Sequence, residues 1–124
     1  MKTVLIVDDE HGIVDALTEV LRDEGLHVVS AANGLLGLQK LAHARVDAVI
    51  LDLMMPILDG KAMLHRMRAS TAHAATPVIL MSAVPEAVAF AAVNQPRPYD
   101  AFLRKPFDLE ELLAILTALL DAAR

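Results

Sequence analysis

The chain has 124 residues, of which 56% are hydrophobic and 22% charged, a composition that favours one compact domain with a buried core over a disordered chain. Its net charge of −5 and its aromatic content of 3% argue against direct nucleic-acid binding, which needs a basic face and stacking side chains. Cysteine is absent, which excludes disulfides, thiolate zinc sites and cysteine nucleophiles. The N-terminal apolar run is too short for a signal peptide or a membrane span, so we expect a cytoplasmic protein without a membrane partner.

Five short apolar runs recur along the chain and predict β-strands. Each is a nearly continuous run of Val, Ile and Leu, which is typical of strands covered on both faces in a parallel sheet. The predicted strands are residues 3–7, 26–31, 48–51, 77–81 and 101–103.

Apolar residues at helical spacing separate these runs. The stripes lie within residues 13–21, 35–42, 63–67, 85–94 and 112–120. Asp59-Gly60 opens the third predicted helix, and Asp108 begins a capping box for the last, with Phe107 placed to pack on Leu112.

The segment before the fifth predicted strand does not continue the preceding helix. Pro96 and Pro98 exclude a continuous helix there, so the fourth helix is predicted from Pro85 to about Asn94. Its body, residues 87–93, is apolar nearly all round, and the last helix also carries apolar residues away from its main stripe. Either these helices are unusually buried, or they leave an apolar surface suited to a partner.

Strands and helices alternate five times with short connections, which predicts right-handed crossovers and a doubly wound α/β sheet. In such sheets, functional residues gather beyond the carboxyl ends of the strands. Asp8 and Asp9 follow the first predicted strand, Asp52 the third, Ser82 the fourth and Lys105 the fifth. We therefore expect three carboxylates, a hydroxyl and an ammonium on one edge of the sheet.

The acidic residues at this edge favour a magnesium site. Two carboxylates held roughly 4 to 5 Å apart repel by about 3 to 4 kcal/mol at an effective dielectric near 20. A divalent cation relieves this repulsion, and oxygen ligands with several waters suit Mg²⁺ better than zinc. A metal, a lysine and a hydroxyl beside a carboxylate nucleophile describe a site for a phosphoryl group. The sequence contains no GxxxxGK segment, which argues against a nucleotide-binding P-loop.

Four segments together carry a family resemblance. They are the run from Val7 to Glu10, the run from Leu51 to Pro56 with Asp59-Gly60, the step Met81-Ser82-Ala83, and the ending Lys105-Pro106-Phe107. In order and approximate separation they resemble the receiver domain of two-component response regulators, as in single-domain chemotaxis receivers. The resemblance implies a flavodoxin-like (βα)5 three-layer sandwich with a five-stranded parallel sheet in the order 2-1-3-4-5. It also implies one receiver domain over residues 1–124, with no output domain in this chain.

The resemblance assigns roles to the residues at the acidic edge. Asp52 would be the phosphoacceptor, attacking the phosphohistidine of a sensor histidine kinase or phosphotransfer protein, or a small phosphodonor. Asp9 would bind Mg²⁺, or Mn²⁺ in its place, directly. Asp8 would act partly through water, and Asp52 and the backbone carbonyl of Met54 would supply further ligands.

Three further residues would respond to the phosphoryl group. Lys105 would pair with it, Ser82 would move to bond it, and Phe102 matches the switch aromatic that turns inward on activation. The face formed by the fourth helix, the fifth strand and the last helix would then bind a downstream effector or a second copy of the chain. The resemblance implies a signalling domain, not an enzyme, that assists only its own phosphorylation and autodephosphorylation.

Alternative functions and simpler readings stand beside this one. A phosphatase of haloacid-dehalogenase type also places an aspartate nucleophile after a parallel strand beside Mg²⁺, but that family expects a second acid where this chain has Met54. A receiver-shaped binding module that is never phosphorylated has no need of the complete acidic set. Asp8 and Asp9 could simply cap the following helix, and Lys105 could form a structural ion pair.

Overall fold

Five parallel strands form a single sheet in the computed structural model, which describes residues 1–90 and 98–122. The strands are β1 (Thr3–Val7), β2 (His27–Ala31), β3 (Ala48–Asp52), β4 (Val78–Ser82) and β5 (Ala101–Arg104). They pair in the order β2-β1-β3-β4-β5, and every pair is parallel. The sequence prediction of a doubly wound sheet in the order 2-1-3-4-5 is therefore confirmed, with strand ends shifted by at most one residue.

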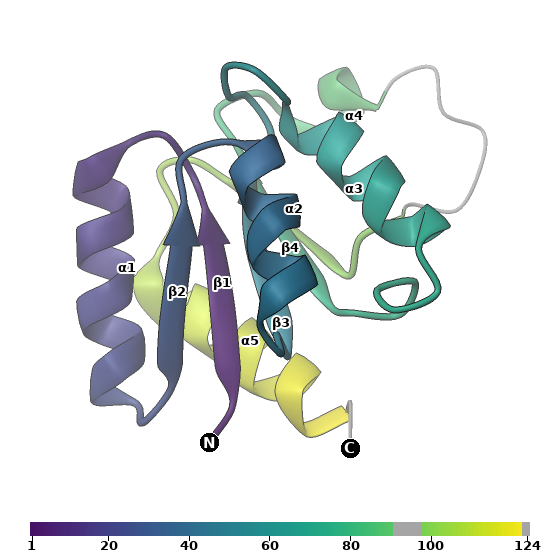
Figure 1. Ribbon diagram of the computed structural model, residues 1–124. Coiled ribbons are helices and arrows are strands. Elements are labelled where there is room, and N and C mark those ends of the chain that lie inside the picture. The colour runs from purple at the N-terminus through teal and green to yellow at the C-terminus, as the bar shows by residue number, and fades with distance from the viewer. Residues whose placement is uncertain (91–97, 123–124) are drawn as a thin grey trace.

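Helices cover both faces of this sheet and complete three layers (Figure 1). They are α1 (His11–Asp23), α2 (Gly34–His43), α3 (Gly60–Ala69), α4 (Glu86–Ala89) and α5 (Leu109–Ala122). Helices α1 and α5 pack against one face, and α2 and α3 pack against the other. Among the described residues, no helix combines the length and apolar character that crossing a bilayer requires.

Each central strand contributes to two hydrophobic cores. Leu5 and Val7 of β1 pack into the core beneath α2 and α3, whereas Val4 and Ile6 pack into the core beneath α1 and α5. Because successive side chains of a strand point to opposite faces, a strand covered on both sides must be apolar at every position. This requirement explains the continuous apolar runs of the sequence.

Polar caps and one glycine shape the helix starts. The Asp59 carboxylate accepts a hydrogen bond from the backbone N–H of Ala62 at 2.9 Å, and the Asp108 carboxylate accepts one from Glu110 at 2.9 Å, as N-cap residues do. Gly60 starts α3 where a Cβ atom would collide with the backbone carbonyl of Asp52. The Asp59-Gly60 pair therefore lets α3 begin directly against the carboxyl end of β3.

The fourth helix is shorter than predicted. The sequence predicts a helix over residues 85–94, but α4 ends at Ala89, and residues 91–94 lie outside the described part of the chain. Phe90 leaves the helical conformation with φ −124° and ψ 31°, and its ring is buried in the core beneath α2 and α3. The Ala89 carbonyl accepts a hydrogen bond from Lys61 of α3, so a tertiary contact holds the end of α4.

The apolar residues of the last two helices are not unusually buried. α4 buries no residue of its own and exposes Val88, while α5 buries only the single stripe of Leu112, Leu116 and Leu120. Of the two interpretations, the described residues support the one in which apolar surface remains open.

Candidate functional site

The predicted site residues come together at the carboxyl edge of the sheet. The register places Asp52 opposite Met81 and Ser82 opposite Arg104, so the ends of neighbouring strands stay level. Asp8, Asp52 and Ser82 are all buried, with 2%, 5% and 1% of their surfaces exposed. These polar groups are held at the edge by strands whose remaining residues, apart from Thr3 at the start of β1, are apolar and buried.

Three carboxylates form the centre of this site. Asp8, Asp9 and Asp52 each offer one oxygen atom, and the three atoms lie within 4.8 Å of one another. At such separations each pair of charges repels by about 3 kcal/mol at an effective dielectric near 20. A hard divalent cation bound by oxygen atoms relieves this repulsion, so the donor set fits Mg²⁺. The backbone of Met54 hydrogen-bonds to the Asp52 carboxylate, which places this part of the loop beside the three acids, and the Met54 side chain is exposed.

Lys105 contacts three carboxylates at once. Its Nζ atom lies 3.1 Å from Asp8 Oδ2, 3.3 Å from Glu10 Oε1 and 3.4 Å from Asp52 Oδ1. Burial alone would lower the pKa of Lys105, but the charges of Asp52, Asp8 and Glu10 raise it above its ordinary value. The ammonium group is therefore cationic at neutral pH. The Lys105–Pro106 peptide bond is cis.

The surroundings of Asp52 alter its pKa. Burial and the neighbouring Asp8 charge raise the pKa of Asp52 from 3.8 to about 6, although Lys105 and the Met54 backbone act in the opposite direction. Most Asp52 side chains are still ionised at pH 7. A carboxylate whose pKa is raised by burial and by a neighbouring acid is a candidate functional group.

The acidic pair after β1 does not cap α1. The N-cap of that helix is Glu10, and its side chain makes no cap hydrogen bond. Asp8 instead uses Oδ1 to accept the Glu10 backbone N–H at 2.9 Å and Oδ2 to contact Lys105. Asp9 is exposed beside it. The simpler interpretation of Asp8 and Asp9 as helix caps is therefore wrong.

Ser82 and Phe102 lie on adjacent strands of the sheet. The Ser82 hydroxyl accepts a hydrogen bond from the backbone N–H of Val84 at 3.1 Å. Phe102 is half-buried on β5, where its ring centroid lies 6.4 Å from Phe90 and 5.9 Å from Tyr99. Both residues are thus close to α4, the helix that follows Ser82.

Sequence reasoning missed two features of this region. Glu10 was included in a sequence motif but was assigned no role. Its contact with Lys105 spans 95 positions and follows no local spacing, so the sequence alone gives no sign of it. The cluster of Phe90, Tyr99 and Phe102 contains three of the four aromatic residues in the chain. The composition shows that aromatic residues are few, but only the fold brings these three together.

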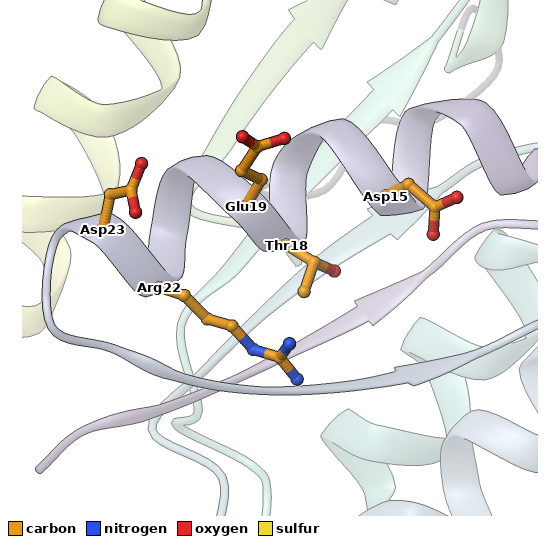
Figure 2. A pocket seen from close by; sticks show the side chains of 5 residues that line it. All are labelled: Asp15, Thr18, Glu19, Arg22 and Asp23. Carbon is orange, nitrogen blue, oxygen red and sulfur yellow. The ribbon is translucent and has the colours of Figure 1, made fainter.

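Two surface hollows differ in their relation to the acidic edge. A groove of about 530 Å³ between α1 and the loop from β5 to α5 includes Glu10 and Lys105 in its walls. A second hollow, of about 360 Å³, is lined by residues of α1 alone (Figure 2). Figure 2 shows these side chains along the helix, which are Asp15, Thr18, Glu19, Arg22 and Asp23. Because no second element contributes to it and no predicted site residue lines it, this hollow is not part of the site.

Residues 4–117 match the sequence model of the family described as the response regulator receiver domain. The chain belongs to this family. Among receiver-containing relatives, it is 34% identical over 118 residues to the probable transcriptional regulatory protein TcrX of Mycobacterium tuberculosis, covering 95% of this chain and 49% of TcrX. It is 36% identical over 117 residues to the response regulator MprA of a Mycobacterium species, covering 94% of this chain and 50% of MprA. The chain thus spans about half the length of these curated relatives.

Solved receivers share the whole fold. The receiver domain of the Francisella response regulator 1452 superposes with a TM-score of 0.87 at 26% identity, covering 100% of both chains. The response regulator TrrA of Thermotoga maritima, solved in complex with Mg²⁺ and BeF, gives a TM-score of 0.81 at 30% identity and covers 96% of this chain and 99% of TrrA. The flavodoxin-like receiver fold is therefore confirmed.

Proposed function

We propose that Asp52 accepts a phosphoryl group in a cytoplasmic phosphorelay, from the phosphohistidine of a sensor histidine kinase or phosphotransfer protein, or from a small phosphodonor. The observation that supports this most directly is the setting of the Asp52 carboxylate. It lies buried at the end of β3, with two further carboxylates within 4.8 Å and the Lys105 ammonium 3.4 Å away. Membership of the receiver family supports the same chemistry.

Magnesium is the cofactor in this proposal, with Mn²⁺ as a substitute. Asp8, Asp9, Asp52 and the backbone carbonyl of Met54 would hold it, and their oxygen atoms suit a hard cation. The cation would neutralise charge on the phosphoryl oxygens and on the acids around them. The solved complex of TrrA with Mg²⁺ and BeF supports the choice of metal by family likeness.

The transfer itself needs little from the protein beyond positioning and charge. An ionised oxygen of Asp52 attacks the phosphorus atom while the bond from phosphorus to the donor imidazole nitrogen breaks, and that nitrogen takes up a proton from solvent as it leaves. With acetyl phosphate, the phosphorus–oxygen bond breaks and acetate leaves. Lys105 pairs with the transferred group, and the Ser82 hydroxyl donates a hydrogen bond to it. Addition of water to phosphorus later returns free phosphate and the Asp52 carboxylate.

The acyl phosphate then acts as a switch in this proposal. Ser82 would exchange its bond with the Val84 N–H for one to the phosphoryl group, and Phe102 would turn inward. The contact of Phe102 with Phe90 supports transmission to α4, because Phe90 directly follows that helix. The face of α4, β5 and α5 would thereby bind a downstream effector or a second copy of the chain.

DNA-binding output, where present, is a property of relatives. RpaA of Synechocystis, which is 33% identical over 120 residues, is described as a DNA-binding dual master transcriptional regulator, and this chain covers 49% of it. The net charge of −5 supports our proposal that the receiver itself does not contact nucleic acid.

Intact-mass measurement after incubation with Mg²⁺ and acetyl phosphate tests the proposed function. The wild type should gain one phosphate that is labile in base, whereas Asp52→Ala should gain none. Asp15→Ala, which removes an exposed acid from α1, should be labelled like the wild type. Absence of the adduct in the wild type would contradict the proposal and favour a binding module. Catalytic release of free phosphate from many substrates would favour the phosphatase.

A further inference from the structure

The three carboxylates that hold Lys105 are not equivalent. The side chains of Asp8 and Asp52 are 0% and 7% exposed, whereas that of Glu10 is 60% exposed. Asp8 also connects the other two partners, because one of its oxygens accepts the Glu10 backbone N–H and the other contacts Lys105. Glu10 thus closes a ring with Asp8 around the ammonium group from the solvent side.

Together with Asp52, Asp8 and Glu10 occupy the N–H donors of Lys105 in the unphosphorylated state. An ammonium group has three N–H donors, and the three carboxylate oxygens at 3.1, 3.3 and 3.4 Å match that number. A phosphoryl group on Asp52 adds strong oxygen acceptors and negative charge on the Asp52 side. The donor that faces Asp52 Oδ1 can turn to the phosphoryl group, but a second bond to that group requires Lys105 to release Asp8 or Glu10, and Glu10 is the more exposed of the two.

We infer that Glu10 is a positioning residue that restrains Lys105 on the Asp8 side of the site and thereby slows phosphoryl acceptance at Asp52. This inference rests on the proposed function. Glu10 lies in the wall of the groove of about 530 Å³ that also exposes Lys105, so its carboxylate faces the same opening as the ammonium. Its negative charge there also opposes an approaching anionic donor.

The rate of phosphorylation by acetyl phosphate at saturating Mg²⁺ tests this inference. Because an exposed ion pair contributes little, Glu10→Gln should raise the second-order rate constant by about two- to fivefold. Glu19→Gln makes the same charge change on α1, nine residues further along the chain and about 13 Å along the helix, and should leave the rate unchanged. Equal rates for Glu10→Gln and the wild type would overturn the inference.

A double-mutant cycle separates restraint of Lys105 from simple charge repulsion. If Glu10 acts through Lys105, the gain from Glu10→Gln should disappear in a Lys105→Met background, since no ammonium remains to be released. A gain of the same size in both backgrounds would show that Glu10 acts on the donor alone, and the restraint would be rejected. High ionic strength suppresses long-range repulsion between Glu10 and the donor. The rate increase of Glu10→Gln in the chain that retains Lys105 should therefore persist at high ionic strength.

A readout that needs no phosphorylation keeps this inference distinct from the proposed function. Relaxation of the Lys105 ¹⁵Nζ signal in the unmodified protein reports how firmly the ammonium is held. Glu10→Gln should increase its mobility while Glu19→Gln does not, and unchanged mobility would refute the restraint. Wild-type protein that takes up no phosphate would instead refute the proposed function, whatever the mobility of Lys105.

Discussion

The Asp52 carboxyl group titrates differently in the folded and unfolded chains. Burial and the Asp8 charge raise the pKa of Asp52 from 3.8 to about 6 in the folded protein. The folded state therefore binds this proton more tightly than the unfolded state. The stability contributed by this tighter proton binding is fully present below about pH 4, declines as the pH rises to about 6, and is absent above that range.

Replacing Asp52 by Asn should remove the loss of stability that the wild type shows as the pH rises. The variant cannot ionise, so without divalent cations it should exceed the wild type in free energy of unfolding by about 3 kcal/mol at pH 8. The difference should shrink as the pH falls through 6 towards 4. Urea unfolding at pH 8 and pH 4.5 measures it, with Asp15→Asn on the exposed face of α1 as the control. A difference that is the same at both pH values would contradict the assigned pKa shift.

At the scale of elements, Arg68 joins three segments that are distant in sequence. From the end of α3, its guanidinium group donates to the carbonyls of Thr76 and Pro98, each at 2.7 Å, and contacts Asp100 at 3.4 Å. The Asp100 carboxylate in turn accepts the backbone N–H of Val78 at 2.8 Å. Arg68 therefore fixes the entries to β4 and β5 against α3.

Removing this guanidinium should destabilise the fold. Arg68→Ala leaves the part-buried carbonyl of Thr76 and the exposed carbonyl of Pro98 without their donor and should lower the free energy of unfolding by about 1 to 2 kcal/mol. Arg68→Lys should recover only part of the loss, because an ammonium cannot match the planar fork of donors. Arg66→Ala, at an exposed position on the same helix, serves as the control in urea unfolding. A loss of stability no larger than that of Arg66→Ala would show that the contacts of Arg68 are dispensable for the fold.

Which elements could be predicted from the sequence depends on the range of the interactions that define them. The strands were readable because burial on both faces demands apolar residues at every position, and Asp8, Asp52 and Lys105 were readable because parallel strands must end at one edge. The end of α4 could not be predicted from the sequence, because an alanine-rich run favours helix locally. At the end of this helix lie contacts that have no local sequence signal: Phe90 packs into the core, and Lys61, 28 positions away, donates to the Ala89 carbonyl.

For the whole molecule, the proposed switch requires a surface that changes when Asp52 is phosphorylated. Val88 on α4 is 64% exposed, next to the aromatic cluster that connects α4 with Phe102 on β5. Exposed apolar side chains on the face that we propose to change with phosphorylation are suited to a protein partner. Of the proposed partners, a second copy of the chain is the one that can be tested without knowing the pathway.

Phosphorylation should promote self-association if that partner is a second copy. With Mg²⁺ and acetyl phosphate, the wild type should sediment faster with increasing protein concentration, whereas Asp52→Ala should not respond. Val88→Glu places a charge on the exposed face and should weaken the association at least tenfold, a loss of about 1.4 kcal/mol. Sedimentation velocity measures both effects. Identical monomeric sedimentation with and without phosphate would exclude the homodimer and leave the effector as the partner.

The ion pair between Lys105 and Asp8 has a consequence for the timing of function during synthesis. The two residues are 97 positions apart, so the site is complete only after β5 has joined β4. At about 5 to 20 residues per second, the ribosome adds Lys105 about 3 to 10 s after Asp52. Until then, a nascent chain carries Asp52 without the Lys105 ammonium that would pair with the proposed phosphoryl group. In the proposed function, therefore, a chain becomes competent to signal only when its last strand is in place.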